Sequence, residues 1–435
     1  MPQRVTPATE SGPSNFQSIF SRGSLIVLVG LLLGSTTINY VDRQVLSVLA
    51  PVLREEFQLN NAEYAAILNA FLITYAFSYS LAGWVIDRLG VGRGLTLAII
   101  WWSTAGALAS LARGPLSLGF FRALLAIGEG GGWPSFAKAI AMWVPPRART
   151  LAIGVCNSGS SLGSIIAPPL VVYLTMQWGW RSAFLVTGLF GFVWVVAFQI
   201  FRRLHPQMQA GDRGHRPGED GNASVRWRSL VRYRQTWAVF FMRFFADSVW
   251  SFYAFWIPEF LTRERGLDLA SIAAVAWIPF LVADIGNVAG GYVTLRLERA
   301  GWSVNRTRKS LLVLATLLSP IGVAAVFAES VFWTIGFISI GIFFWMFWAV
   351  TVHTLPGDYF PPHAVASVFG LGGTGSTLGS VVSTWAVGYT LDLTQSYVPV
   401  FVGIGLLMPV AFVVGFSLMG RVEPIRFAAG EEANR

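Results

Sequence analysis

An acidic and a basic residue stand side by side in a long apolar segment near the start of the chain. The pentapeptide Asn39-Tyr40-Val41-Asp42-Arg43 lies in the run from residue 24 to residue 50, which is long enough to cross a bilayer because about 20 apolar residues suffice. Each charge near the middle of a membrane costs at least about 2.5 kcal/mol, so such groups face a cavity and are usually functional. We expect either an ion pair that holds helices together or a site that handles an anion, a proton or both.

Arg43 and Glu129 have the chemistry of an anion site and a proton site. A guanidinium presents a planar fork that matches a carboxylate, and the contact is strong where water is scarce. Glu129 follows a long apolar run and precedes three glycines, so burial favours its neutral form and lets it carry a proton. Arg122 lies seven positions earlier, on the same face of a helix, where it can pair with Glu129. We therefore take Glu129 and its possible partner Arg122 as candidate proton-coupling residues, with Arg122 structural rather than substrate-binding.

The second half of the chain offers fewer candidates. Asn287 lies in an apolar segment, where an unpaired amide is costly, so it is a candidate for contacting a substrate hydroxyl. Ser160 and Ser376 either contact a substrate or hydrogen-bond to their own helix. Asp247 and Asp284 are either proton or cation sites or partners of Arg243, and for Asp247 we favour the structural role.

Aromatic residues in the apolar segments leave two alternatives open. Trp250, Tyr253 and Trp256 recur every third position, and Trp345 and Trp348 follow the same spacing. Such side chains either stack on a sugar ring or pack against helices and lipid. We retain Tyr253, Trp256 and Trp348 as candidate substrate contacts.

The elements that must position these residues are membrane-spanning helices. The chain is 54% hydrophobic and only 12% charged, whereas a soluble domain has about 25% charged residues. We expect an all-α integral membrane protein with an N-terminal tail (1–23), a six-helix bundle (24–201), a linker (202–235), a second six-helix bundle (236–420) and a C-terminal tail (421–435). The twelve predicted spans are 24–50, 61–86, 94–112, 116–143, 150–176, 181–201, 236–261, 270–295, 310–328, 331–355, 364–391 and 396–420.

The distribution of Lys and Arg predicts the orientation of these spans. One side, which includes both termini and the linker, carries 22 of the 31 basic residues, and the other side carries five. Because loops rich in Lys and Arg stay in the cytoplasm, we expect both termini on the cytoplasmic side of the inner membrane. This distribution also explains the net charge of +9 without any nucleic acid as partner.

The two predicted halves share an internal repeat. The segment 145–164 recurs at 361–380, with the same offset of 216 residues throughout and identical residues at nine of twenty positions. Two related six-helix halves are typical of transporters whose binding site lies between the halves at mid-membrane. The spacing of Gly154, Gly159 and Gly163 also permits close helix packing, which requires no substrate.

The loop between the second and third predicted spans carries a family signature. Its sequence from Gly83 through Asp87, Arg88 and Gly90 to Arg93 resembles the loop motif of the major facilitator superfamily. A carboxylate at a helix end and arginines in a tight turn can stabilise one conformation of such a bundle. We expect this loop to control conformation and not substrate recognition.

Further motifs resemble the anion:cation symporter family, especially its bacterial hexuronate and aldonate transporters. They are the pentapeptide at 39–43, Gly128-Glu129-Gly-Gly-Gly-Trp133-Pro134, residues 178–184, residues 247–258, residues 283–291 and residues 355–361. Ser248 departs from the uronate branch, which often has Pro at this position. The resemblance implies that Arg43 binds a substrate carboxylate, that Asp42 and Glu129 handle protons, and that Tyr40 and Tyr75 contact substrate hydroxyls.

The resemblance implies proton-coupled symport of a sugar acid by alternating access, in a monomer that needs no cofactor. The alternatives are an anion exchanger, a uniporter or a Na⁺-coupled symporter of another carboxylate, such as a small aromatic acid. A membrane sensor or enzyme is the remaining alternative. Neither lysine lies in a phosphate-binding loop, no nucleophile–His–acid set is evident, and the four histidines and Cys156 have no metal-ligand spacing, so we expect no metal.

Overall fold

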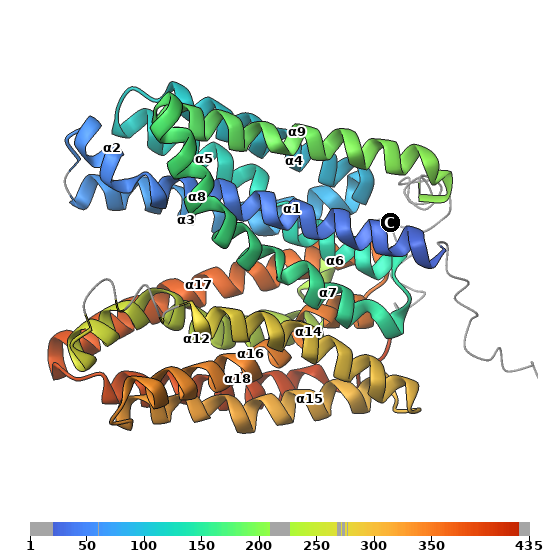
Figure 1. Ribbon diagram of the computed structural model, residues 1–435. Helices are drawn as coiled ribbons and strands as arrows, with labels where there is room; N and C mark the ends of the chain where they lie inside the picture. Colours follow the sequence, from blue (N-terminus) through green and yellow to red (C-terminus); the bar gives the residue numbers. More distant parts are fainter. Residues whose placement is uncertain are drawn as a thin grey trace, which may run out of the picture.

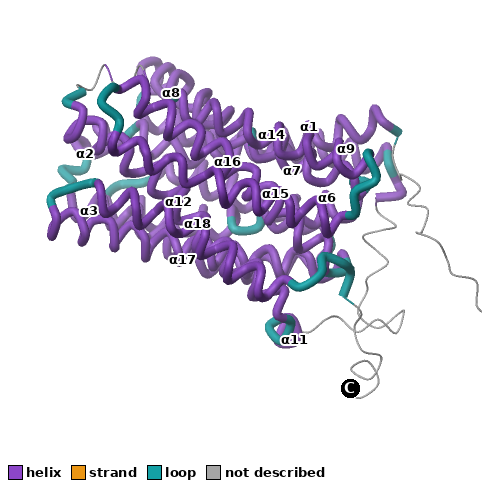
Figure 2. Tube along the Cα trace, turned by 90° about the horizontal axis from the view of Figure 1, so that it is seen from below, coloured by secondary structure: helices purple, strands orange, loops and turns teal. Residues whose placement is uncertain are grey.

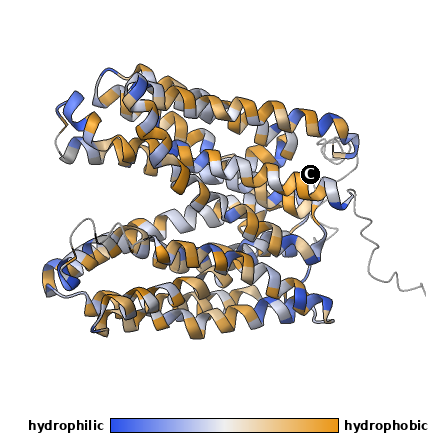
Figure 3. Ribbon diagram, viewed as in Figure 1, coloured by the Kyte–Doolittle hydropathy of each residue, from blue (hydrophilic) through white to orange (hydrophobic). Residues whose placement is uncertain are grey.

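The computed structural model describes residues 21–59, 61–208, 227–267, 271, 275 and 277–425. These residues form helices and no strand (Figure 2). Ten of the helices in this part of the chain are long and apolar enough to cross a membrane. Hydrophobic residues cover the helices along much of their length, and hydrophilic residues gather at the helix ends (Figure 3). The prediction of an all-α, multi-pass membrane protein is confirmed.

The first half of the chain folds into helices that pack around one another, at the top of Figure 1. They are α1 (Arg22–Val48), α2 (Ala50–Glu56), α3 (Asn61–Leu89), α4 (Val91–Leu108), α5 (Pro115–Glu129), α6 (Gly132–Trp143), α7 (Arg149–Asn157), α8 (Gly159–Trp178) and α9 (Trp180–Leu204), with short 3₁₀ turns at Ala109–Leu111 and Pro146–Ala148.

The second half forms the other group of helices in Figure 1. They are α11 (Trp227–Leu230), α12 (Arg234–Arg265), α14 (Ile278–Arg299), α15 (Val304–Leu318), the 3₁₀ helix η3 (Ser319–Phe327), α16 (Val331–Tyr359), α17 (Pro362–Thr394) and α18 (Val398–Met419). Of the predicted tails and linker, residues 1–20, 209–226 and 426–435 lie outside the described residues.

Helix boundaries follow local signals in the sequence. Ser303 and Ser330 accept hydrogen bonds from the first-turn N–H groups of α15 and α16, as N-cap residues do. Gly266 ends α12 in the left-handed conformation, with a φ of 64°, which glycine adopts without steric cost. These residues determine where α12 ends and where α15 and α16 begin.

Two of the twelve predicted spans are not among the ten apolar helices. The segment 116–143 is divided into α5 and α6 at Gly130 and Gly131, so neither piece is long enough alone. The segment 236–261 lies in the 32-residue α12, which carries Arg243 and Asp247 near its middle and is therefore less apolar. Both of these segments contain charged residues inside the predicted span: Arg122 and Glu129 in the first, and Arg243 and Asp247 in the second.

Glycines at equivalent positions of the repeat pack equivalent helices together. Gly159 and Gly163 bring α8 against the backbone of α1, at Leu33 and Thr37. In the second half, Gly375 and Gly379 bring α17 against the backbone of α12, at Phe240 and Phe244. Any side chain at these four positions would collide with the facing helix. The internal repeat thus corresponds to the same helix contact in both halves.

Candidate functional site

The two charged residues singled out in the first half form a direct ion pair. Nε of Arg43 on α1 donates to a carboxylate oxygen of Glu129 at the end of α5, at 2.5 Å. The Glu129 side chain is fully buried, whereas 21% of the Arg43 side chain is exposed. Nη2 of Arg43 has no hydrogen-bond partner among the described residues. In this conformation the guanidinium therefore keeps one buried donor without a hydrogen-bond partner in the described chain.

Three aromatic rings surround the Arg43 guanidinium. Its central carbon lies 5.3 Å from the ring centre of Tyr40, 5.2 Å from Phe71 and 4.4 Å from Tyr75. Such contacts stabilise a cation without neutralising it. The structure thus brings Tyr40 and Tyr75 to Arg43, and it adds Phe71, which the sequence did not single out because it is one of 33 phenylalanines.

Asp42 and Arg122 lie next to this pair, inside the first group of helices. Nη1 of Arg122 is 3.4 Å from the carbonyl oxygen of Asp42, and its guanidinium carbon is 4.8 Å from the centre of the Phe71 ring. Asp42, Arg122 and Thr187 line a small cavity between α1, α4, α5 and α9. Arg43, and not Arg122, is therefore the direct partner of Glu129.

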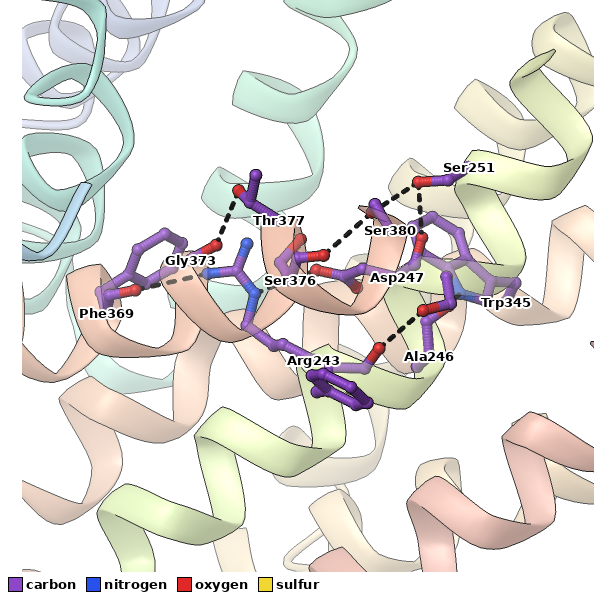
Figure 4. A network of polar contacts seen from close by, with 12 residues as sticks. Arg243, Ala246, Asp247, Ser251, Trp345, Phe369, Gly373, Ser376, Thr377 and Ser380 are labelled. Carbon is purple, nitrogen blue, oxygen red and sulfur yellow. Dashed lines mark hydrogen bonds and ion pairs between the residues drawn. The ribbon is translucent and has the colours of Figure 1, made fainter. Parts of the chain in front are cut away.

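Asn287 and Ser160 take part in contacts near the boundary between the two halves. The side-chain oxygen of Asn287 on α14 accepts a hydrogen bond of 3.2 Å from the amide of Asn157 on α7. The Ser160 hydroxyl donates to the carbonyl oxygen of Asn157 at 2.7 Å, which is the self-bonding alternative for this serine. Ser376 lies beside Asp247 (Figure 4).

The aromatic candidates of the second half belong to helix packing. Tyr253 is buried with its hydroxyl next to Gly322 of η3. Trp348 is buried in the apolar core of the second half, and Trp256 packs against that core. The rings of Trp250 and Trp345 stack at 5.3 Å. None of the contacts described for these five residues joins them to Arg43.

The last turn of α3 contacts the second half through Asp87. Its carboxylate pairs with Nζ of Lys138 on α6 at 3.0 Å and accepts hydrogen bonds from the N–H groups of Ser367 at 2.7 Å and Ala366 at 3.3 Å. Both N–H groups belong to the first turns of α17, where a carboxylate is favoured. Gly83 lies against the backbone of Ala366 so closely that no side chain would fit.

The other residues of the predicted loop motif make contacts within the first half or face outward. The Arg88 guanidinium lies 3.9 Å from the ring centre of Trp84, Gly90 begins α4 with a φ of 80°, and Arg93 is exposed. Lys138 is the partner of Asp87 that sequence reasoning missed. It was identifiable as one of only two lysines in the chain and lies in an apolar segment.

A second group of charges at the same end of the molecule was also missed. Arg308 is buried between Glu298, at 3.0 Å, and Asp358, at 2.9 Å. Arg149 at the start of α7 donates to the carbonyl oxygen of Gly357 in the second half, at 3.1 Å. The sequence placed most of these residues in loops, which gave no reason to bring them together.

The hydrogen bonds found between the two halves of the described chain gather toward this end. They join residues 76–87 of α3 to residues 366–374 of α17, and residues 149–157 to Asn287 and Gly357. In Figure 1 the two groups of helices meet on the right, near α6 and α7, and diverge on the left. The structure is therefore closed at the end that carries Asp87.

Comparison with known proteins agrees with this architecture. The Major Facilitator Superfamily profile matches residues 32–384. The chain is 30% identical to the hexuronate transporter of Escherichia coli K12, over 86% of this chain and 89% of that protein. It is 31% identical to the galacturonate transporter of Dickeya chrysanthemi, over 67% and 88%. Superposition on the solved structure of the proton:xylose symporter XylE gives a TM-score of 0.72. The match covers 93% of this chain and 98% of that chain, at 12% sequence identity. The protein therefore belongs to the major facilitator superfamily and is a transporter, not an enzyme.

Proposed function

We propose that this transporter is a proton-coupled symporter of an organic anion, and that the anion is a sugar acid: a hexuronate, an aldonate or an aldarate. The observation that carries the proposal is the buried pair of Arg43 and Glu129. Two relatives are named as transporters of hexuronate and of galacturonate, and these names support the choice of substrate class.

Arg43 is the anchor for the substrate carboxylate in this proposal. Its Nε is held by Glu129 while Nη2 has no partner in the described chain, so the guanidinium is oriented before the substrate arrives. Tyr40 and Tyr75 lie against the same guanidinium and are placed to contact the hydroxyl groups of a sugar acid. Such a site is pre-organised, which reduces the entropic cost of binding.

Glu129 couples the proton to the anion. Moving one negative charge inward against about 100 mV costs roughly 2.3 kcal/mol, so accumulation requires positive charge to enter with it. Protonation of Glu129 removes the counter-charge of Arg43 and frees the guanidinium for the substrate. Release of the substrate follows loss of the proton into the more alkaline cytoplasm. Asp42 is the second candidate for carrying a proton.

Alternating access follows from the separable contacts between the halves. The closed end carries Asp87 and the start of α1, and the distribution of basic residues supports the proposal that this end faces the cytoplasm. In the inner membrane this conformation would admit substrate from the periplasm. We further propose that the protein works as a monomer, driven by the proton gradient without a cofactor.

Uptake into proteoliposomes tests the proposal. With an acidic exterior, the purified protein should concentrate at least one of galacturonate, galactonate and galactarate, and an uncoupler should abolish accumulation. Exchange that is independent of pH would instead identify an anion exchanger. Accumulation driven by a Na⁺ gradient would identify a Na⁺ symporter, and uptake restricted to benzoate-like acids would change the substrate class.

A further inference from the structure

The second half of the transporter contains a buried ion pair that resembles the one between Arg43 and Glu129. Nε of Arg243 donates to a carboxylate oxygen of Asp247, one turn later on α12, at 3.1 Å. Nη1 of Arg243 is 3.4 Å from the carbonyl oxygen of Phe369 on α17, which is a weak contact. Figure 4 shows the guanidinium between Phe369 and Asp247. As in Arg43, the Nε atom donates to a protein carboxylate, and an aromatic ring lies against the guanidinium, here that of Phe369 at 4.8 Å.

Two tyrosines on α3 connect the two guanidinium groups. The Arg43 carbon is 4.4 Å from the ring centre of Tyr75, and the rings of Tyr75 and Tyr79 are 5.1 Å apart. The Arg243 carbon is 5.8 Å from the ring centre of Tyr79. The two guanidinium carbons can therefore be no more than about 15 Å apart. One cation comes from each half of the transporter, and α3 lies between them.

This upper limit leaves room for an anion with an acid group at each end. The end carbons of an extended six-carbon chain are about 6 Å apart, and each guanidinium–carboxylate contact adds about 4 Å. A six-carbon diacid joining two guanidinium groups thus needs about 14 Å, which does not exceed the limit. Its central hydroxyl groups would pass Tyr75 and Tyr79.

We propose that Arg243 is a second anion-binding residue, which makes the preferred substrate a sugar acid with a carboxylate at both ends. This inference rests on the proposed function, because it assumes that Arg43 binds one carboxylate. Binding across both halves also gives the substrate a role in bringing them together, since each end contacts a different half. A monoanionic sugar acid would use only Arg43.

Three acids with the same hydroxyl configuration test the inference. Galactarate has a carboxylate at both ends. Galacturonate has a carboxylate at one end and an aldehyde carbon at the other, and galactonate has a carboxylate at one end and an alcohol at the other. We expect wild-type uptake, as Vmax/KM, to favour galactarate by at least about tenfold, the size of one lost charge-assisted contact. If the wild-type protein transports the two monoanions as well as galactarate, the inference is wrong and the proposed function stands. If it transports none of the three acids, the proposed function fails with it.

A paired substitution separates binding from conformational effects. Arg243→Gln combined with Asp247→Asn removes both charges, so no unpaired charge is left buried. We expect galactarate uptake to fall at least about tenfold and galactonate uptake to stay within threefold. An equal loss for all three acids would overturn the inference, because Arg243 would then serve the contact between the halves. If the double variant does not fold, thermal unfolding of the wild-type protein in detergent gives the same comparison. Galactarate should raise the melting temperature more than galactonate does at equal concentration. An equal rise with both acids would overturn the inference.

Discussion

The Arg43–Glu129 pair is costly to bury, and in the proposed mechanism this cost makes it responsive to a proton. Removing both charges from water is compensated in part by their mutual contact and by the aromatic rings around Arg43. Loss of either charge leaves the other without a partner at membrane depth. A proton on Glu129 and an anion on Arg43 are therefore expected to bind together, because each restores the charge balance that the other disturbs.

Replacing Arg43 with lysine tests whether the shape of the guanidinium matters beyond its charge. Arg43→Lys keeps the charge but loses the planar fork and the Nη donors. We expect uptake to fall at least about a hundredfold, equivalent to roughly 2.7 kcal/mol. Initial uptake rates normalised to protein abundance provide the measurement, and Arg113→Lys, at an exposed position, is the matched control. Near-normal uptake by Arg43→Lys would remove Arg43 from the site.

Glu129→Gln mimics the protonated acid and separates binding from coupling. The variant should bind substrate and exchange it across the membrane, because Arg43 then lacks its competing carboxylate. It should lose uphill uptake under a proton gradient, since no proton is exchanged at this position. Counterflow and gradient-driven uptake in the same proteoliposomes give both readouts. If the variant still concentrates substrate, coupling lies elsewhere, and Asp42→Asn is the next variant to measure.

At the scale of helices, the sequence predicts the spans well and their contacts poorly. All twelve predicted segments overlap helices in the described part of the chain, and ten of them match helices long and apolar enough to cross a membrane, because long apolar runs have few alternatives there. Partners are harder to predict, since they depend on how helices cross. The sequence did not decide whether Arg43 or Arg122 pairs with Glu129, and it indicated no ion-pair partner for Lys138. The aromatic spacing at Tyr253 was equally compatible with packing, and the structure shows packing.

Asp87 joins α3 and α6 to the first turn of α17, so its loss should affect conformation. Asp87→Asn weakens the contact with Lys138 and with the two N–H groups of α17. We expect a transport rate at least about fivefold lower, with substrate affinity in detergent within threefold of wild type. Isothermal calorimetry and uptake assays measure the two quantities. A large loss of affinity would show that Asp87 contributes to binding instead.

Close packing of α8 on α1 makes a stability prediction. A methyl group at Gly159 would meet the Leu33 carbonyl oxygen and the Thr36 side chain, each at 2.8 Å. Gly159→Ala should therefore destabilise the protein by about 1–3 kcal/mol. Gly30→Ala, on the same bundle with no atom within 4 Å, should be neutral or slightly stabilising because alanine favours helix. Thermal unfolding in detergent compares the two, and equal melting temperatures would contradict the packing argument.

At the scale of the whole molecule, the proposed alternating access requires the closed end to open. The halves are joined there by hydrogen bonds between polar side chains and backbone, together with glycine contacts such as Gly83 on α17. Such contacts are individually weak, worth about 1 kcal/mol each, so they can be exchanged for equivalent contacts at the opposite end. This balance could not be derived from the sequence, because a repeat indicates two similar halves without stating which end is closed.

A disulfide between the halves should arrest the transporter in this conformation. The hydroxyl oxygens of Ser80 on α3 and Thr374 on α17 are 2.6 Å apart, so cysteines at both positions are close enough to cross-link. The buried native cysteine would first be removed as Cys156→Ala. Oxidation should reduce uptake at least about tenfold while external substrate still binds, and a reductant should restore uptake. Each single-cysteine variant under the same oxidant is the control. Full-rate uptake by fully cross-linked protein would show that α3 and α17 stay together throughout the cycle, and the opening proposed here would then have to occur between α7 and α14 alone.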